Sequence, residues 1–292
     1  MTDQALQTAI LAWYAKNGRA LPWRATTDPY AIVVAELMLQ QTQVERVIPK
    51  YLAWLEQFPN FAVLAEAPTS AVIAAWSGLG YNRRALYLRA AAQAVVGLGT
   101  LPTTVAEFQK LPGIGPYTAA AIAAFTYNQD IALVDTNIKR FYQLLIFGDQ
   151  TRPTDKAVLA IAEQYLPPSQ SRDWHNALMD IGTVISRVRG AKTQQAVLVQ
   201  LFPMLASWPL PNVSDEPLKR PKQSSFLGSR RYWRGWLIKL LTRSNQSTLK
   251  QLKTSLLGQQ KLAIANDLEK ILTDLIDDQL VAFDGHYYSL AK

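Results

Sequence analysis

The sequence contains no cysteine and only two histidines, His175 and His286, among its 292 residues. Without a thiolate the chain cannot hold iron through sulfur, and two histidines so far apart are too few for a structural metal site. It also contains no apolar run near 20 residues, so we expect no membrane span. Residues 1–11 show no charged-then-apolar leader but instead predict the start of an amphipathic helix, and no internal repeat stands out.

Apolar residues make up 49% of the chain, which is enough to fill one large or two moderate cores. The formal net charge of +8 favours an anionic partner whose affinity falls steeply with salt. The charge is uneven, because no acid lies between Glu216 and Asp267. That stretch carries many basic residues: Lys219, Arg220, Lys222, Arg230, Arg231, Arg234, Lys239, Arg243, Lys250, Lys253 and Lys261.

A glycine-containing turn, Gly113-Ile114-Gly115, lies between two helical patterns in residues 111–140. Glycine permits close backbone approach and positive φ, and the helix predicted for residues 116–125 would begin with bare N–H groups. Such a nest suits a phosphate, so we expect a contact to a DNA backbone that is independent of base sequence. The alternative is a glycine-rich turn between helices that binds nothing.

Asp135 follows four apolar residues and precedes a helical pattern that runs to about residue 146. The helix dipole and free N–H groups at that position favour the ionised carboxylate, so we expect Asp135 to carry a permanent negative charge. The alternative is an ordinary helix N-cap, because Asp, Thr and Asn are common there.

Glu36 is the one acid in the apolar segment of residues 31–39. A glutamate in such surroundings is costly to ionise, so we expect a raised pKa and a role as general acid. The alternative is a glutamate on the wet face of a helix, although the segment has little else to define such a face. A neutral acid at Glu36 and an anion at Asp135 suit cleavage of a glycosidic bond through an oxocarbenium-like transition state.

Six segments resemble those of the helix-hairpin-helix DNA glycosylases, most closely the MutY-type adenine DNA glycosylases. They are LPWR (21–24), AELMLQQTQV (35–44), WSGLGYNRRA (76–85), LPGIGPYTA (111–119), VDTNIKR (134–140) and NALMDIGTVI (176–185). They span roughly residues 8–190 in the family's order. The resemblance implies an all-α two-lobed fold with the base pocket between the lobes.

The resemblance also assigns roles to individual residues. It implies that Glu36 protonates the flipped adenine at N7, that Asp135 stabilises or briefly bonds the anomeric carbon, and that Asn137 and Tyr117 support these carboxylates. Further positions match the base pocket and the side chains that wedge into the DNA stack. These are Trp23, Arg24 and Leu39 in the pocket wall, Asp180 near the adenine, and Gln41 and Tyr81 as wedges; without the pattern they read as core or surface residues. Asn82 replaces a second tyrosine of the family after Tyr81 and reads either as a contact to a base edge or as an uninvolved turn residue.

Tyr117 occupies the place where relatives with lyase activity have a lysine. A phenol cannot form the Schiff base that an amine forms with a sugar aldehyde, and the nearest lysine, Lys110, precedes the hairpin. We therefore expect a monofunctional glycosylase that leaves an intact abasic site.

Relatives usually hold a [4Fe–4S] cluster on four cysteines after the NALMDIG segment. The corresponding positions here are Ser186, Thr193, Ala196 and approximately Phe202, so the resemblance implies a clusterless variant without a cofactor, apart from room for a monovalent cation at the hairpin. We expect apolar packing to close this part of the fold instead, through Val197, Leu198, Leu201 and Phe202.

The C-terminal region predicts helices at about 232–241, 248–256 and 265–277, followed by two strands around Asp284-Gly285. Three helices and a hairpin indicate a small α+β winged-helix-like domain rather than a NUDIX-like one. We expect Arg230, Arg231 and Arg234 to contact the DNA backbone, although a basic run is often only solvated surface and winged helices also bind proteins. The predicted domains are a glycosylase domain (1–206), a linker (207–229) and the winged-helix-like domain (230–292).

Together these features predict a cytoplasmic, monomeric enzyme that removes adenine mispaired with 8-oxoguanine or guanine in double-stranded DNA. Two alternatives stay open: a thymine or uracil glycosylase acting on mispairs with guanine, and a non-catalytic DNA-binding protein. Glu36 favours a purine, because protonation at N7 is chemistry that pyrimidines cannot use. Retention of both carboxylates in costly surroundings argues against a protein that has lost its activity.

Overall fold

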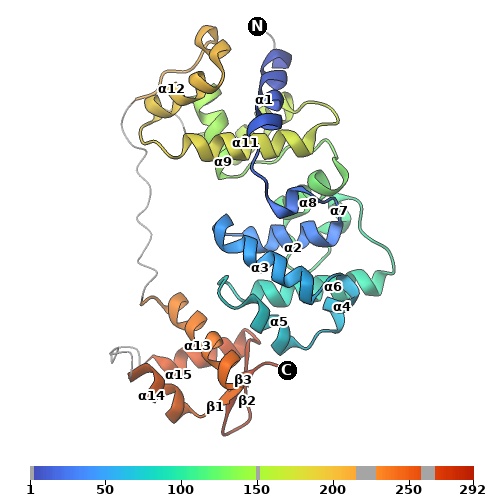
Figure 1. Cartoon of the computed structure of the whole chain (residues 1–292), viewed down its shortest axis with the longest axis vertical. Coiled ribbons are helices and arrows are strands. Elements are labelled where there is room, and N and C mark those ends of the chain that lie inside the picture. Colours follow the sequence, from blue (N-terminus) through green and yellow to red (C-terminus); the bar gives the residue numbers. More distant parts are fainter. Residues whose placement is uncertain (1–2, 149–151, 215–227, 258–266) are drawn as a thin grey trace. The chain divides into compact units, whose positions relative to one another are not determined.

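The computed structural model describes residues 3–148, 152–214, 228–257 and 267–292. In these residues the chain is mostly helical (Figure 1), and it divides into two compact units. Unit 1 comprises residues 1–29, 103–108 and 115–221, and unit 2 comprises residues 30–102, 109–114 and 222–292. The predicted all-α two-lobed fold with a small α+β C-terminal region is confirmed.

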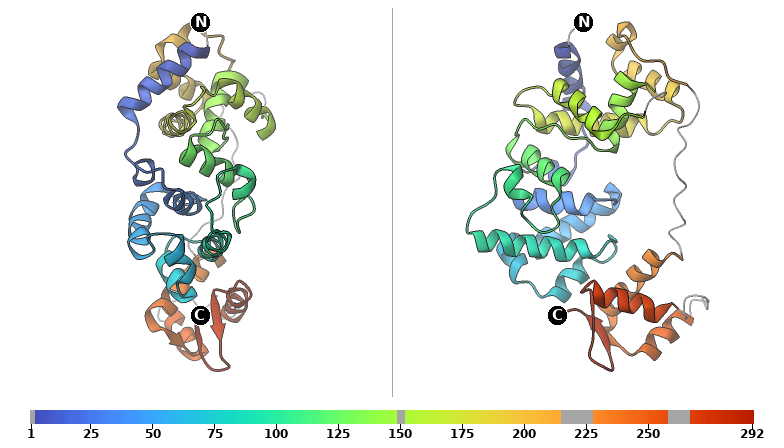
Figure 2. Two further views of the ribbon diagram at one scale, coloured as in Figure 1. Left: turned by 90° about the vertical axis from the view of Figure 1, so that its right-hand side faces the viewer. Right: turned by 180° about the vertical axis from the view of Figure 1, so that it is seen from behind.

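Unit 1 is built around one central helix, α11 (Ser171–Ile185), which packs against α1, α8, α9 and α12. Figure 2 shows α11 lying between α1 and the segment that contains α8 and α9. The core face of α11 carries Trp174, Leu178 and Ile181, which are all buried. The other elements are α1 (Asp3–Asn17), η1 (Pro22–Arg24), α7 (Val105–Phe108), α8 (Pro116–Tyr127), α9 (Thr136–Tyr142), η2 (Gln143–Phe147), α10 (Asp155–Tyr165), α12 (Ala191–Leu201) and η3 (Pro203–Ser207).

Unit 2 begins with α2 (Pro29–Leu39), a helix that is buried almost all round. An apolar helix without a polar face belongs in the middle of a core. Neighbouring buried aromatic rings, such as Trp54 and Trp76, meet edge to face and fill the space beside it. The helices that follow are α3 (Val44–Gln57), α4 (Phe61–Glu66), α5 (Thr69–Trp76) and α6 (Arg83–Leu98).

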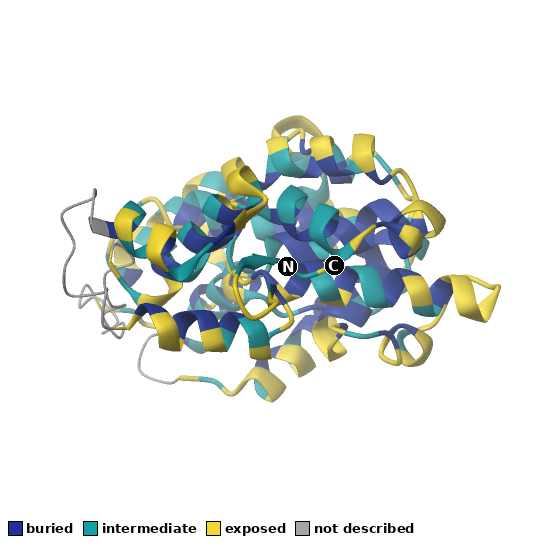
Figure 3. Cartoon of the chain, turned by 90° about the horizontal axis from the view of Figure 1, so that it is seen from below, coloured by how far each residue is buried: buried dark blue, intermediate teal, exposed yellow. Residues whose placement is uncertain are grey.

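Helix boundaries follow local signals in the sequence. Asn60 and Thr154 cap α4 and α10 by accepting hydrogen bonds from backbone N–H groups, and α6 ends at Gly99 in a left-handed conformation. The helix predicted from residue 116 is α8, and the one predicted after Asp135 is α9 continued by a π-helical turn, η2. Figure 3 shows the result: buried residues gather on the inner faces of the helices, and exposed residues lie on turns and outer faces.

The C-terminal region contains the predicted three helices and hairpin. They are α13 (Arg230–Ser244), α14 (Leu249–Leu257), α15 (Leu268–Asp277), β2 (Val281–Phe283) and β3 (Tyr288–Leu290), with a short β1 (Gln246–Ser247) that completes an antiparallel sheet of order β1-β3-β2. This arrangement is that of a winged helix.

The core of this region is continuous with α5. Its buried residues, including Trp233, Leu237 and Leu272, share one apolar cluster with Ile73 of α5. Residues 230–292 fall in unit 2, and their separation as a domain stays a prediction. Most of the predicted linker, residues 215–227, lies outside the described residues. Among the helices described, none is long and apolar enough to cross a membrane.

Candidate active site

Asp135 is the N-cap of α9 and is held by three hydrogen bonds. One carboxylate oxygen accepts from the backbone N–H groups of Asn137 (2.9 Å) and Ile138 (2.7 Å), and the other accepts from the side-chain amide of Asn137 (3.3 Å). Asp135 is therefore an N-cap, which was the alternative interpretation, and Asn137 is hydrogen-bonded to it; the catalytic roles expected for both residues stay predictions. The carboxylate has one fixed orientation as a result.

The pKa of Asp135 shifts in the direction opposite to our expectation. Burial raises the pKa of Asp135, and the hydrogen bonds from Ile138 and Asn137 together with the positive charge of Arg140 only partly oppose this. The expected lowering by the helix end is thus outweighed by desolvation. A carboxylate that is short of solvation interacts strongly with a positive charge that develops beside it, which suits stabilisation of an oxocarbenium ion.

A close helix crossing places Asn137 beside Asp135. Gly182 of α11 faces Asn137 so closely that an added Cβ would lie 2.6 Å from the Asn137 Cβ and backbone oxygen. Arg140 completes the arrangement by donating to the side-chain oxygen of Asn137 (3.0 Å) and to the backbone carbonyl of Gly182 (3.1 Å). The glycine in the NALMDIG segment therefore has a packing reason.

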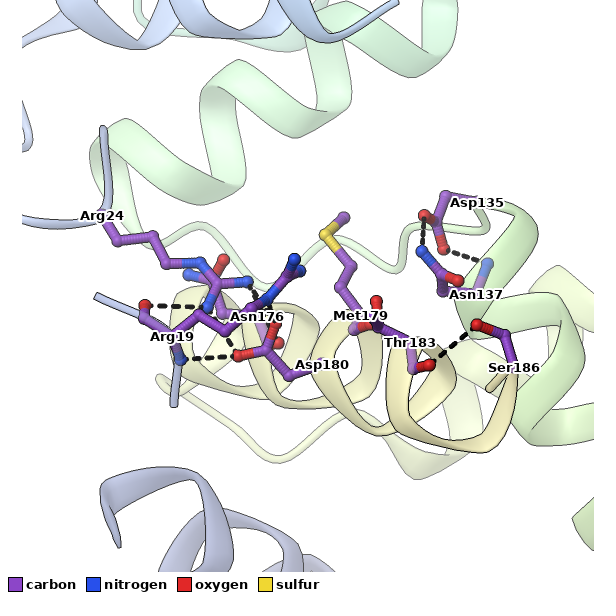
Figure 4. Close-up of polar contacts among 9 residues, drawn as sticks. All are labelled: Arg19, Arg24, Asp135, Asn137, Asn176, Met179, Asp180, Thr183 and Ser186. Carbon is purple, nitrogen blue, oxygen red and sulfur yellow. Dashed lines mark hydrogen bonds and ion pairs between the residues drawn. The ribbon is translucent and has the colours of Figure 1, made fainter. Parts of the chain in front are cut away.

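Asp180 lies on α11, two residues before Gly182, in a different environment from Asp135 (Figure 4). One of its oxygens accepts from Nε of Arg19 (2.5 Å) and from Arg24 (2.9 Å), and the other accepts from the Arg19 backbone N–H (2.9 Å) and from Arg24 (2.7 Å). The Asp180 side chain is 3% exposed and that of Arg24 is 8% exposed. Burial by itself would raise the pKa of Asp180, but Arg24 and Arg19 outweigh it and hold the pKa below its usual value.

Two residues expected at the base pocket, Arg24 and Asp180, belong to this ion-pair cluster. Within the described residues the oxygens of Asp180 accept hydrogen bonds from Arg19 and Arg24, so Asp180 links the N-terminal segment to α11. Trp23, between them in sequence, is also buried at 7% exposed. The roles expected for Trp23 and Arg24 in the pocket wall, and for Asp180 near the adenine, stay predictions.

Glu36 occupies a distinctive place on α2. Every other residue from Tyr30 to Met38 is buried, and Glu36 alone in that stretch is partly exposed. The residues around Glu36 are buried, as expected for a helix without a polar face, whereas the Glu36 side chain lies at the edge of the core. Leu39, one turn further, is also partly exposed. Glu36 belongs to unit 2 and Asp135 to unit 1, so each is described within its own unit.

Two exposed loops of unit 2 carry the residues expected to wedge into DNA. Gln41 follows α2 with φ 54°, and Tyr81 precedes α6 with φ 47°. Both side chains are exposed, with Tyr81 45% exposed. Non-glycine residues with such backbone angles are uncommon and cluster at functional sites. Asn82, by contrast, is 8% exposed and lies inside the turn, which disfavours contact with a base edge.

In the hairpin, Gly113 has φ 76°, and an added Cβ there would lie 2.5 Å from the Tyr87 side chain. Gly113 therefore needs to be glycine for both conformation and space, whereas Gly115 has φ −83° and caps α8. Ile114 is buried and anchors the turn. Tyr117 lies in the first turn of α8 and is 40% exposed.

Comparison with known proteins agrees with this arrangement. Residues 34–168 match the family described as HhH-GPD superfamily base excision DNA repair protein. The adenine DNA glycosylase of Mycobacterium tuberculosis (strain H37Rv) is 33% identical over 240 residues, which cover 80% of this chain and 77% of that protein. The chain belongs to the adenine DNA glycosylase family of the HhH-GPD superfamily. A relative of the same name from Buchnera aphidicola is 38% identical over 192 residues, covering 63% of this chain.

The match to the adenine DNA glycosylases does not extend over all of their length. It spans 54% of the Buchnera aphidicola protein and 64% of the one from Mycolicibacterium smegmatis. Among solved structures, a thermostable thymine-DNA glycosylase has a TM-score of 0.59 with 28% identity, covering 63% of this chain and 87% of that one. An endonuclease III–DNA complex with a TM-score of 0.52 and 17% identity shares the fold.

The residues after α11 do not fit the iron–sulfur cluster that relatives usually hold at this position. The hydroxyl of Ser186 donates to the Thr183 carbonyl, and Thr193 and Ala196 are exposed. Within the described residues no group of three or more His, Cys, Asp or Glu side chains is placed to hold a metal. Leu198 and Phe202 are buried, and Phe202 meets Trp13 edge to face, so apolar packing closes this part of the fold.

Two of the three arginines of α13 that we expected to contact DNA form ion pairs within the protein. Arg230 forms an ion pair with Asp274, and Arg234 pairs with both Asp274 and Asp278. Both acids lie in or just after α15, whose position in chain order is that of a recognition helix. Arg231 differs, because it donates to the hydroxyl of Tyr81 (2.9 Å).

Sequence reasoning missed several residues that organise the site. Arg84, Arg140 and Gly182 were given no role from the sequence, and His175 was considered only as a metal ligand, although two of these residues carry a signal. Arg84 is a cation at the N-terminus of a helix, where the dipole disfavours it, and Gly182 is a glycine inside a helix.

Proposed function

We propose that this chain is a DNA glycosylase that removes adenine mispaired with 8-oxoguanine or guanine from double-stranded DNA. The observation that carries the proposal is Asp135, an under-solvated carboxylate fixed at a helix N-cap, in a chain that retains Glu36 on α2. The 33–38% identity to proteins named adenine DNA glycosylases supports adenine as the base.

In the proposed reaction Glu36 donates a proton to N7 of the extruded adenine. The bond between the anomeric carbon and N9 then breaks, and its electron pair leaves with the adenine. Asp135 stabilises the resulting oxocarbenium ion, and water adds to the anomeric carbon and loses a proton. Hydrolysis of this kind balances without a cofactor.

Tyr117 supports a reaction that stops at the abasic site. Its phenol stands at the position where a lysine would form a Schiff base with the opened sugar. The product would therefore be an intact strand with an alkali-sensitive site.

Extrusion of the base would rely on Gln41 and Tyr81, whose exposed side chains stand on left-handed backbone. Turning a base out of the stack costs a few kcal/mol, which such wedges offset. The backbone N–H groups of Gly113 and Gly115 would hold a phosphate, beside the Ile114 N–H, which already donates to the Leu111 carbonyl (3.2 Å). Arg231 would hold another phosphate. We propose that the enzyme acts as a cytoplasmic monomer.

A second candidate is removal of thymine or uracil from mispairs with guanine. It is favoured by the structural likeness to a thermostable thymine-DNA glycosylase at 28% identity. Asp135 suits both reactions, whereas a proton donor for N7 suits only the purine.

The test is a panel of duplexes that each contain one mispair, incubated with the protein and then treated with alkali. We expect strand scission only at adenine opposite 8-oxoguanine or guanine, and loss of scission in Glu36→Gln and Asp135→Asn. A matched control is Glu45→Gln, which removes an exposed acid at the start of α3. Scission at thymine or uracil would select the second candidate. Binding without scission at any base would show a non-catalytic protein.

A further inference from the structure

Arg84 connects the two loops that carry Gln41 and Tyr81. It lies in the first turn of α6 and is 7% exposed. Its guanidinium donates to the carbonyls of Leu37 (2.5 Å) and Met38 (3.2 Å), which belong to the last turn of α2. A cation at this end satisfies carbonyls that have no partner within the helix and complements the negative end of its dipole.

The same guanidinium holds the peptide groups that lead into both left-handed residues. It donates to the Gln40 carbonyl (2.7 Å), which belongs to the peptide joined to Gln41, and to the Gly80 carbonyl (3.0 Å), which belongs to the peptide joined to Tyr81. It also donates to the hydroxyl of Thr42 (3.1 Å). One rigid planar group therefore fixes the start of both loops.

Aromatic rings complete the surroundings of Arg84. Its guanidinium carbon lies 5.2 Å from the centre of the Trp76 ring and 5.6 Å from that of Tyr81. Among the described residues no carboxylate forms an ion pair with Arg84. Burial lowers the pKa of Arg84 to about 10, so the guanidinium is charged at neutral pH without a neutralising acid.

A buried arginine with only neutral partners is a costly way to build a turn. The burial of Arg84 is explained if the spacing between the Gln41 loop and the Tyr81 loop matters more for function than the stability of each loop. Left-handed backbone at Gln41 and Tyr81 is strained, and strain persists only where the surroundings over-determine the conformation.

We propose that Arg84 is a positioning residue for base extrusion, which sets the height and separation of the Gln41 and Tyr81 wedges through their preceding peptide groups. This inference rests on the proposed function, because it assigns a cause to one step of that reaction. Arg84 itself does not contact the reacting atoms.

The test compares Arg84→Met and Arg84→Lys with the parental protein in single-turnover cleavage of two duplexes. The first duplex has a mispaired adenine between matched flanking pairs, and the second has the same adenine between mismatched flanking pairs, where extrusion is easier. The matched control is Arg89→Met, because Arg89 lies on the same helix and holds the single carbonyl of Ala67 (2.8 Å), away from both loops.

We expect Arg84→Met to lose about ten-fold or more in rate on the first duplex and less than about three-fold on the second. Arg84→Lys should lie between, since an ammonium reaches fewer of the oxygens, and Arg89→Met should match the parental ratio. Equal losses on both duplexes would show that Arg84 only supports folding, and unchanged rates would show that it has no role; either result overturns the proposal.

A second measurement separates this proposal from the proposed function. A 2-aminopurine next to the mispaired base becomes brighter when it unstacks, so the parental protein should raise its fluorescence and Arg84→Met should not. Absence of cleavage by the parental protein would reject the glycosylase function alone. A fluorescence rise that is equal in the parental and Arg84→Met proteins would reject the role of Arg84 alone. If Arg84→Met fails to fold, the same comparison is made with Arg84→Lys.

Discussion

The imidazole of His175 accepts a hydrogen bond at Nε2 from the backbone N–H of Leu133 (3.0 Å), two residues before Asp135. Its other nitrogen, Nδ1, lies 2.6 Å from the carbonyl of Ser171 one turn earlier in α11. The ring is therefore a neutral tautomer that donates at Nδ1 and accepts at Nε2. It ties the segment that leads into Asp135 to the central helix of unit 1.

The buried histidine predicts how stability depends on pH. Burial lowers the pKa of His175 to about 4, whereas the unfolded chain has the ordinary value near 6.5. The unfolded state therefore binds the proton first, so stability is complete above about pH 6.5 and falls by up to about 3 kcal/mol as the pH drops toward 4. Denaturant titrations across this range should show the loss in the parental protein.

His286 provides the control for this experiment, because it is the other histidine of the chain and is exposed. The fall in stability between pH 6.5 and 4 should shrink in His175→Gln and persist in His286→Gln. An identical fall in all three proteins would mean that His175 is not the group responsible.

Asp135→Asn should separate activity from stability. The side-chain oxygen of asparagine can accept hydrogen bonds from the same backbone N–H groups at the cap, but the substitution removes the under-solvated charge. The pKa of Asp135 is raised in the folded state. The free energy of unfolding of the parental protein therefore falls as the pH rises from the usual pKa of the carboxyl to its raised pKa. The variant should thus unfold at the same or a higher temperature at neutral pH, with a difference that vanishes in acid, while cleavage falls by about 100-fold or more. A large fall in melting temperature would mean that the charge supports the fold.

Asp180→Asn should act through stability. It would leave two arginine side chains beside a neutral amide in a buried site, at a cost of about 3 kcal/mol. Thermal unfolding and cleavage of different mispairs should be measured together. We expect a lower melting temperature with an unchanged order of preference among mispairs. A change in base preference at an unchanged melting temperature would restore the contact of Asp180 with the base.

Among Arg230, Arg231 and Arg234 of α13, Arg231 should contribute most to binding DNA. Arg230 and Arg234 pair with acids near α15, whereas the described residues show no carboxylate paired with Arg231. Plotting the logarithm of DNA affinity against that of salt concentration should give a slope about 1 smaller for Arg231→Gln. The slope should stay unchanged for Arg230→Gln and Arg234→Gln. Equal effects of all three substitutions would show that the ion pairs open when DNA binds.

Tyr117→Lys should introduce a new reaction with the abasic product. An amine at this exposed position in α8 can form a Schiff base with the opened sugar, which borohydride reduces to a stable protein–DNA adduct. The parental protein should give no such adduct. Trapping of the parental protein in high yield would contradict the monofunctional reaction, and Tyr117→Phe serves as the control for loss of the hydroxyl.

The helical fold could be predicted from the sequence because helices depend on local patterns, and the same patterns make Glu36 and Asp135 candidates for the site. Glu36 is conspicuous in an apolar helix, Asp135 is an N-cap by residue type and position, and the hairpin at Gly113 follows from turn chemistry. The winged helix was also readable, since three amphipathic segments and a turn at Asp284-Gly285 are short-range signals.

What could not be predicted depends on residues that are distant in sequence. Asp180 contacts Arg19 and Arg24, which are more than 150 residues away in the sequence. The direction of the pKa shift of Asp135 depends on how deeply α9 is buried. Burial raises the pKa, and the N–H groups at the helix end lower it. The pairing of Arg234 with Asp278 likewise depends on how α15 folds back on α13.

The apolar cluster that joins Ile73 to Trp233 means that the last sixty or so residues and α5 should melt as one cooperative block. A chain truncated before α13 would leave part of α5 bare to water, and would therefore tend to self-associate rather than behave as a smaller enzyme. The indole of Trp233 is buried within that block and would meet water when the block opens.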